Sequence, residues 1–219
     1  MTYKLSPSRI NLFFECRRCF WLRVNENVKR PSGPFPSLLS GMDAAIKNHF
    51  DRFRKRGEKP PELEEMDLEP FPDLGFLELA RDWRTEPKWE DPETGTVLRG
   101  GVDDLLLSKD DRVVVMDYKT RGYPPKQRDG APDYYERQVN LYNLILRENG
   151  RETEDYGIIL YYYPDRILAN GDIVFYKEYR KTPVDIEKAK ETVREAVKIL
   201  ENDIPPHNED CDFCEWSAE

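Results

Sequence analysis

The sequence predicts a mixed α/β fold in which helices flank a central β-sheet. Two apolar runs, residues 105–107 and 113–116, are separated by a polar turn, which is the pattern of a β-hairpin inside a buried sheet. An amphipathic helix is predicted next, over residues 134–147, and two more strands and a last helix follow it. The 219 residues contain no repeat, no low-complexity linker and no apolar run of membrane length, so we predict one domain with one core.

The first third of the chain is predicted to be mainly helical. Ser6 and Pro7 predict the first helix, because serine caps a helix N-terminus and proline fits its first turn. Proline and acidic residues predict an irregular crossing over residues 57–75. The predicted elements of this part are helices near 7–16, 37–55 and 74–84, with a Pro/Gly-rich loop at 30–36.

The chain from residue 88 onward is predicted to build the sheet and its covering helices. A first strand and turn are predicted over residues 88–101, with Trp89 in the core. The hairpin follows, and a Gly/Pro loop over residues 122–132 leads into the helix. The last predicted elements are strands at 156–163 and 172–179 and an amphipathic helix at 184–201, capped by Thr182 and Pro183.

Charged residues lie at one end of the hairpin. Asp103 precedes the first strand, while Asp117 and Lys119 end the second strand, so antiparallel pairing brings all three together. Asp117 and Lys119 are two residues apart and therefore point to the same face. Two carboxylates can hold Mg²⁺ or Mn²⁺, and a neighbouring ammonium can stabilise charge on a phosphate. The alternative is a solvated hairpin end with a surface ion pair, which the four apolar residues before Asp117 disfavour.

Three motifs in this order resemble the PD-(D/E)XK nuclease superfamily, in its RecB-like branch. They are Gly-x-Val-Asp ending at Asp103, Asp-x-Lys from Asp117 to Lys119, and Gln-x-x-x-Tyr from Gln138 to Tyr142. The resemblance implies a restriction-endonuclease-like core in which the two aspartates bind the metal and the lysine is catalytic. It further implies that Gln138 and Tyr142, one helical turn apart, contact the DNA strand near the scissile phosphate.

The resemblance also divides the single domain, residues 1–219, into three parts. A helical N-terminal part covers about 1–85, the nuclease core about 86–180, and a C-terminal helix and cysteine tail about 181–219.

One expected histidine is missing. Many RecB-like nucleases carry a metal-binding histidine on the helix before the hairpin, and this chain offers Asp43 at that place. We therefore expect Asp43 as a third carboxylate ligand, or else as a polar residue on an exposed helix face. His49 lies nearly two turns away and is a poor geometric substitute.

Four cysteines form two Cys-x-x-Cys pairs near opposite ends of the chain: Cys16 with Cys19, and Cys211 with Cys214. This pattern predicts a four-thiolate site for zinc or an iron–sulfur cluster. The sequence shows no signal peptide, which disfavours disulfides and predicts a reducing cytoplasm. RecB-like nucleases with a 4Fe-4S cluster, among them CRISPR-associated exonucleases, join the ends of the domain with one cysteine before the core and three after it. The resemblance thus implies a 4Fe-4S cluster, and the two-plus-two arrangement leaves zinc as the alternative.

The net charge of −9 argues against general nucleic-acid binding but allows contact along a groove. Local basic residues next to aromatic ones predict stacking and phosphate contacts with a single strand. The predicted DNA-binding residues are Arg17, Arg18, Arg121, Lys126 and Arg128.

The sequence is therefore interpreted as a Mg²⁺- or Mn²⁺-dependent deoxyribonuclease that acts on single-stranded DNA or DNA ends. The resemblance is compatible with repair, recombination or CRISPR adaptation. The alternatives are a non-catalytic DNA-binding module with a zinc site, and a zinc protein whose Asp-x-Lys motif is coincidental. The complete set of two aspartates and a lysine disfavours the first alternative, and the ordered third motif disfavours the second.

Overall fold

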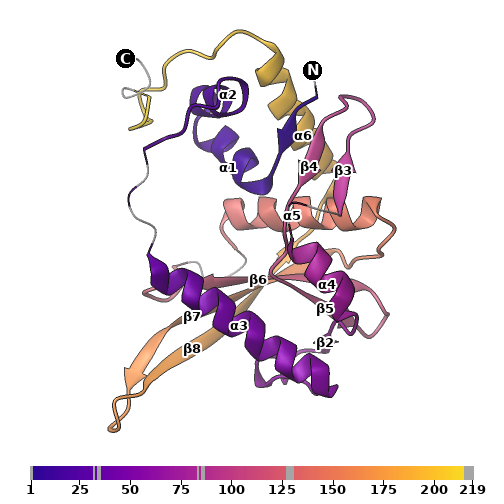
Figure 1. Ribbon diagram of the computed structural model, residues 1–219, viewed down its shortest axis with the longest axis vertical. Coiled ribbons are helices and arrows are strands. Elements are labelled where there is room, and N and C mark those ends of the chain that lie inside the picture. The colour runs from indigo at the N-terminus through magenta and orange to yellow at the C-terminus, as the bar shows by residue number, and fades with distance from the viewer. Residues whose placement is uncertain are drawn as a thin grey trace.

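A mixed five-stranded sheet forms the centre of the protein, whose computed structural model describes residues 2–31, 33, 36–82, 84, 87–126 and 131–214. The strand order is β2-β5-β6-β7-β8, with β6 and β7 parallel and every other pair antiparallel. The strands are β2 (Leu68–Pro70), β5 (Asp104–Ser108), β6 (Val113–Thr120), β7 (Tyr156–Ile167) and β8 (Ile173–Pro183). The β7–β8 pair continues beyond the sheet as a projecting ribbon (Figure 1).

The two faces of the sheet are covered by different helices, because side chains along β6 alternate between them. Met116 and Tyr118 pack with α3 on one face, and Val115 packs with α4 and α5 on the other. Gly157 allows close approach of α5, since a Cβ there would lie 2.5 Å from Val139 Cγ1. The covering helices are α3 (Ser37–Arg56), α4 (Leu74–Arg81) and α5 (Asp133–Glu148).

A further layer of helices lies over α5, on the side away from the sheet (Figure 1). At the start of the first helix in the chain, the Ser6 side chain accepts a hydrogen bond from the Arg9 backbone N–H. Cys16 ends this helix and caps the next one. The layer consists of α1 (Pro7–Glu15), α2 (Arg17–Asn25), α6 (Ile186–Glu201) and a small sheet of β1 (Lys4–Leu5), β4 (Val97–Arg99) and β3 (Lys88–Glu90). The first and last parts of the chain thus share one layer.

The predicted mixed α/β fold is confirmed, together with the hairpin and the helices at α1, α3, α4, α5 and α6. The region predicted as irregular contains a 3₁₀ turn, Pro61–Leu63, and the edge strand β2. The segment predicted as one strand and turn is a hairpin of β3 and β4, and α2 and β1 were not predicted. In the described part of the chain, no helix combines the length and apolar character needed to cross a bilayer.

Candidate functional site

The register of the central hairpin brings Asp103 beside Asp117. Asp104 pairs with Met116 across β5 and β6, so the residues at the next position face each other just beyond the ladder. One oxygen of Asp103 accepts a hydrogen bond from the Tyr118 backbone N–H at 3.0 Å. The carboxylate that precedes β5 is therefore fixed to the strand that carries the second one.

Asp117 is buried at the end of β6, with a relative exposure of 1%. It forms an ion pair with Lys119, as predicted from their two-residue spacing. Among the described residues, neither Asp117 oxygen accepts a hydrogen bond of ordinary geometry. Burial raises the pKa of Asp117 to about 7; Lys119 opposes this shift and Asp103 adds to it. A cation that balanced both carboxylates would remove this cost of burial, so this acidic pair fits a divalent metal.

A chain of hydrogen bonds continues from Lys119 to α5. The Lys119 ammonium donates to Gln138 Oε1 at 3.3 Å, and Gln138 Nε2 donates to the Tyr142 hydroxyl at 2.8 Å. The Lys119 Nζ atom also lies 4.6 Å from the centre of the Tyr135 ring. Burial, followed by the charge of Asp117, raises the pKa of Tyr142, so this hydroxyl stays protonated. Gln138 of the third motif therefore contacts the lysine of the second motif, and Tyr142 is connected to that lysine through Gln138.

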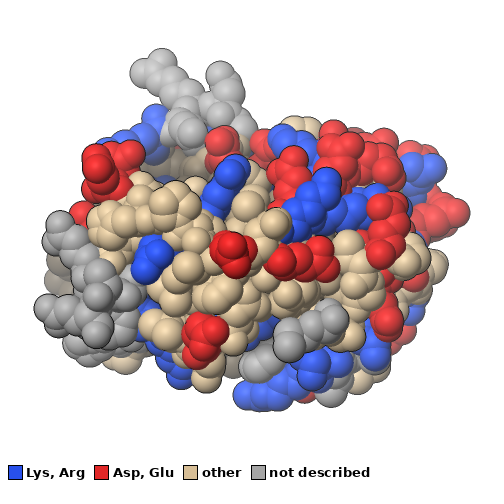
Figure 2. Space-filling model, turned by 90° about the horizontal axis from the view of Figure 1, so that it is seen from above, with Lys and Arg blue, Asp and Glu red and all other residues tan. Residues whose placement is uncertain are grey.

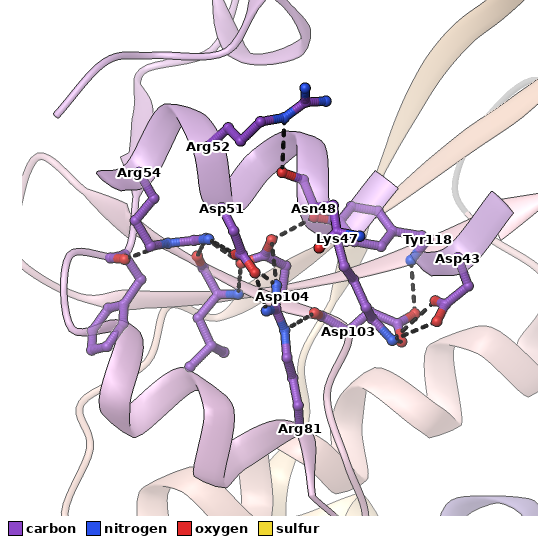
Figure 3. Close-up of polar contacts among 12 residues, drawn as sticks. Asp43, Lys47, Asn48, Asp51, Arg52, Arg54, Arg81, Asp103, Asp104 and Tyr118 are labelled. Atoms are coloured by element: carbon purple, nitrogen blue, oxygen red, sulfur yellow. Dashed lines mark hydrogen bonds and ion pairs between the residues drawn. The ribbon is translucent and has the colours of Figure 1, made fainter. Parts of the chain in front are cut away.

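Asp43 lies on α3, where Lys47 connects it to Asp103. The Lys47 ammonium is 2.9 Å from a carboxylate oxygen of each aspartate (Figure 3). Asp43 and Asp103 are thus close enough to share one cation. His49 instead contacts Glu62 at 3.0 Å.

Behind Asp103, a buried ionic network ties α3 and α4 to the hairpin (Figure 3). Asp104, which is fully buried, pairs with Arg54 and Arg81 and accepts a hydrogen bond from the Tyr118 hydroxyl. Arg81 also donates to the backbone oxygen of Asp103 at 2.9 Å. Burial raises the pKa of Asp104, and the two arginines oppose that shift. Asp104, which follows Asp103, and Tyr118, which follows Asp117, therefore belong to the same network.

Lys47, Arg54 and Arg81 were not identified from the sequence. Lys47 carried a local signal, because it lies four residues after Asp43 on a predicted helix. Arg81 carried none, since its partners are distant in the sequence. Arg54 has a local partner in Asp51, three residues earlier, but its pair with Asp104 spans 50 residues.

The site opens into a cavity of about 730 Å³ between the sheet and the layer that contains α1. Asp103, Gln138 and Tyr142 line one side of this cavity. The N-terminal part of α1 lines the other side, where Pro7 lies against the backbone at Gly100.

The structure distributes the predicted DNA-binding residues over two regions. Arg121 follows β6 near Lys119, with its guanidinium 4.9 Å from the Tyr123 ring centre, and Lys126 is exposed in the same loop. Arg17 and Arg18 line a different cavity, beside the segment after α6, where Arg18 donates to the Pro205 backbone oxygen. Arg128 lies outside the described residues.

All four cysteines meet in the layer that contains the first and last helices. Their sulfur atoms lie within 4.8 Å of one another, and all four residues are buried. The Sγ–Sγ distances are 3.4 Å for Cys16 with Cys214 and 3.7 Å for Cys19 with Cys211. These distances exceed the roughly 2.05 Å of a disulfide and suit thiolates around one metal centre.

Local donors favour the thiolate form of Cys16, whereas burial raises the pKa of Cys19 and of Cys214. Burial raises the pKa of Cys16, but the Cys19 backbone N–H and the neighbouring thiols outweigh it and lower the pKa to about 7. Arg30 Nη2 donates to Cys211 Sγ at 3.5 Å, and its guanidinium lies 4.6 Å from the Phe213 ring centre. The predicted four-cysteine group that joins the terminal regions is confirmed.

Comparisons with known proteins agree with this architecture. A family model described as the PD-(D/E)XK nuclease superfamily matches residues 35–218. The chain therefore belongs to the PD-(D/E)XK nuclease superfamily, whose members are generally nucleases.

Among solved structures, one titled "Crystal structure of SSO0001" is similar at 13% sequence identity and a TM-score of 0.44. The match covers 98% of this chain and 84% of that chain. No curated protein matches the sequence.

Proposed function

We propose that this protein is a Mg²⁺- or Mn²⁺-dependent deoxyribonuclease that hydrolyses phosphodiester bonds in single-stranded DNA or at DNA ends. The observation that carries the proposal is the buried Asp117 carboxylate, which lies beside Asp103 and ion-pairs with Lys119. An unsatisfied buried carboxylate next to a second one is costly in a purely structural hairpin. The same arrangement is useful when a divalent cation and a phosphate bind there.

Each residue has a distinct proposed role. Asp103 and Asp117 hold the divalent cation, and Asp43 is a further carboxylate close to Asp103. The cation, when bound, activates water and neutralises charge on the phosphate. Lys119 stabilises the negative charge that develops on the phosphate oxygens. Gln138 accepts a hydrogen bond from Lys119, and Tyr142 accepts one from Gln138, so both position the lysine and face the substrate strand.

The first test measures cleavage of labelled single-stranded DNA with Mg²⁺ or Mn²⁺ and with EDTA. We expect cleavage with metal and none with EDTA. Asp117→Ala and Lys119→Ala should each lower the rate by at least about 10³-fold, because each removes charge stabilisation at the phosphate. The exposed residues Asp110 and Lys198 provide matched controls, and Asp110→Ala and Lys198→Ala should cleave like the unaltered protein. Undiminished cleavage by both site variants would overturn the proposal.

We further propose that the four cysteines hold a structural metal. Tetrahedral zinc with Zn–S bonds of about 2.3 Å places its sulfur atoms roughly 3.8 Å apart. The 3.4 and 3.7 Å distances here are close to that value and therefore favour a single ion. The family resemblance supports the other candidate, a 4Fe-4S cluster, which needs more room between its thiolates. Metal analysis and the visible spectrum of anaerobically purified protein separate them: one zinc per chain without colour, or iron with a broad band near ~400 nm.

A further inference from the structure

The cavity beside the candidate active site is strongly basic, although the chain carries a net charge of −9. Asp103 is the one acidic residue among its described lining residues. Its basic residues come from both layers: Lys4, Arg9, Arg23, Lys47, Arg81 and Arg99. Figure 2, which views the molecule from above, instead shows acidic and basic side chains mixed over the outer face. The face seen in that view therefore lacks the one-sided charge of the cavity lining.

Two of these basic residues form ion pairs with carboxylates in or next to the acidic site, but among the described residues the other four do not. Lys47 pairs with Asp103, and Arg81 pairs with Asp104 and Asp51. Within the described part of the chain, Lys4 and the three remaining arginines form no ion pair with a carboxylate.

The three unpaired arginines contact neutral acceptors and retain donors. Arg9 donates to the Lys4 backbone oxygen, Arg23 donates to Asn27 Oδ1 at 2.6 Å, and Arg99 donates to the Arg84 backbone oxygen at 3.3 Å. The Arg99 Nε atom is buried without a hydrogen-bond partner among the described residues. Burial lowers the pKa of Arg9, and the nearby charge of Arg23 lowers it further. An anion in this cavity would supply acceptors to these guanidinium groups and relieve their mutual repulsion.

The cavity is also continuous with the residues assigned to cleavage, because Asp103, Gln138 and Tyr142 form part of its wall. Its volume of about 730 Å³ lies in the range of pockets that enclose a small ligand. Pro7 of α1 lies against Gly100 at its edge, so the helical layer covers this side of the site. We infer that this space suits a flexible single strand.

We propose that this cavity binds the phosphates next to the scissile bond in a single nucleic-acid strand, with Arg9, Arg23 and Arg99 as the phosphate-binding residues. This inference rests on the proposed nuclease function for the position of the scissile bond. It adds a subsite that the three sequence motifs do not contain. The subsite lies on the α1 side of the site, and Arg121 and Lys126 are not among its lining residues.

The test is a binding measurement that does not depend on cleavage. Fluorescence anisotropy of a labelled single-stranded oligonucleotide is followed with the full chain over a range of KCl concentrations, without added divalent metal and without a chelator, so that the cysteine-bound metal is kept. Arg9→Gln, Arg23→Gln and Arg99→Gln should each weaken binding about tenfold, because each removes a charged phosphate contact. The slope of log K against log[salt] should become shallower by about 0.7 for each lost contact.

The control is Arg112→Gln, an exposed arginine in the turn at the far end of the β5–β6 hairpin. Its binding and salt slope should match those of the unaltered protein. Arg23→Lys keeps the charge and should recover most of the affinity, which separates charge loss from misfolding. Thermal unfolding of each variant provides the check on folding.

Each remaining outcome is decisive. If all three glutamine variants bind like Arg112→Gln, the subsite is overturned and the proposed nuclease function is untouched. If a duplex binds as well as the single strand with the same arginine dependence, or a mononucleotide displaces the strand at equal concentration, the single-strand assignment is overturned. If binding falls as expected but the unaltered protein cleaves nothing with metal, the subsite stands and the nuclease function fails.

Discussion

Lys47 lies between Asp43 and Asp103, beside the Asp103–Asp117 pair to which the proposed function assigns a metal. Its ammonium is 2.9 Å from both Asp43 and Asp103, so it balances their charge. Carboxylates that can share an ammonium can also share a divalent cation. Under the proposed function, Asp43 takes the place of the histidine that the family resemblance implies, and its carboxylate is a harder ligand for the metal.

This arrangement gives a prediction for metal affinity. Asp43→Ala should raise the Mn²⁺ concentration needed for half-maximal cleavage at least several-fold, because it removes negative charge beside the Asp103 carboxylate. The measurement is a metal titration of nuclease activity, with the exposed Asp110→Ala as control. An unchanged titration curve would assign Asp43 only to its ion pair with Lys47.

The buried arginines give a second prediction, about stability. Arg54→Met should lower the free energy of unfolding by about 3–5 kcal/mol, because it leaves the fully buried Asp104 with one fewer counter-charge. Arg56→Met, two residues later on the same helix, removes an exposed ion pair with Glu58 and a contact with the Phe53 ring, and should cost about 0–1 kcal/mol. Denaturant unfolding measures both, and similar losses in the two variants would contradict this account of the network.

At the scale of elements, the sequence predicted the parts with strong local periodicity. The hairpin, α3, α5 and α6 carry long apolar patterns, and the two-residue spacing correctly placed Asp117 and Lys119 on one face. The short strands β1 and β2 were missed, and β3 and β4 were predicted only as one strand and a turn, because strands of two or three residues are shorter than any detectable alternation. They form through long-range pairing, as when β1 pairs with β4. The cavity above the site was missed for the same reason, since its wall joins these unpredicted strands to α1.

The contact between α1 and the site gives a third prediction. Gly100 is the glycine of the Gly-x-Val-Asp motif, and a Cβ there would lie 2.8 Å from Tyr142 Cε1 and 3.0 Å from Pro7 Cδ. Gly100→Ala should therefore displace the Tyr142 ring, lower cleavage and destabilise the fold by about 1–3 kcal/mol.

Gly41→Ala is the matched control, because Gly41 lies within α3 and its Cβ would meet nothing within 4 Å. It should stabilise the helix by about 0.5–1 kcal/mol. Thermal unfolding and a cleavage assay measure both variants. Full activity and unchanged stability in Gly100→Ala would contradict a tight contact between Pro7 of α1, Gly100 and Tyr142.

At the scale of the whole molecule, the four-thiolate cluster joins segments 198 residues apart in the sequence. A cross-link over such a loop restricts the unfolded chain strongly, and metal binding adds its own free energy to folding. The cluster contacts α1, α2 and the segment after α6, whereas the acidic pair lies on the central sheet. We therefore expect loss of the cysteine cluster to lower the stability of the protein, and loss of the acidic pair to lower its activity.

Cys16→Ser and Cys214→Ser should lose the metal and about 4 kcal/mol or more of stability together. Removal of the metal by a chelator under reducing conditions should have the same effect on the unaltered protein. Asp117→Ala provides the contrasting control, with activity lost and the cysteine-bound metal retained. Metal content and melting temperature are the readouts. A cysteine variant that kept its melting temperature but lost activity would assign the cluster a role in the chemistry.

The separation of Cys16 from Cys214 also sets an order of events during synthesis on the ribosome. At translation rates of about 5–20 residues per second, the first cysteine pair emerges roughly 10–40 s before the second. The strands of the central sheet and α5 all precede residue 184, so they can assemble in that interval. The helices α1 and α2 lack their packing partner until α6 and the last cysteines have been synthesised. Until then, the thiols of Cys16 and Cys19 stay exposed. Under the proposed metal assignment, the metal binds last, and a cell short of it would accumulate chains whose central sheet has formed but whose helical layer has not closed.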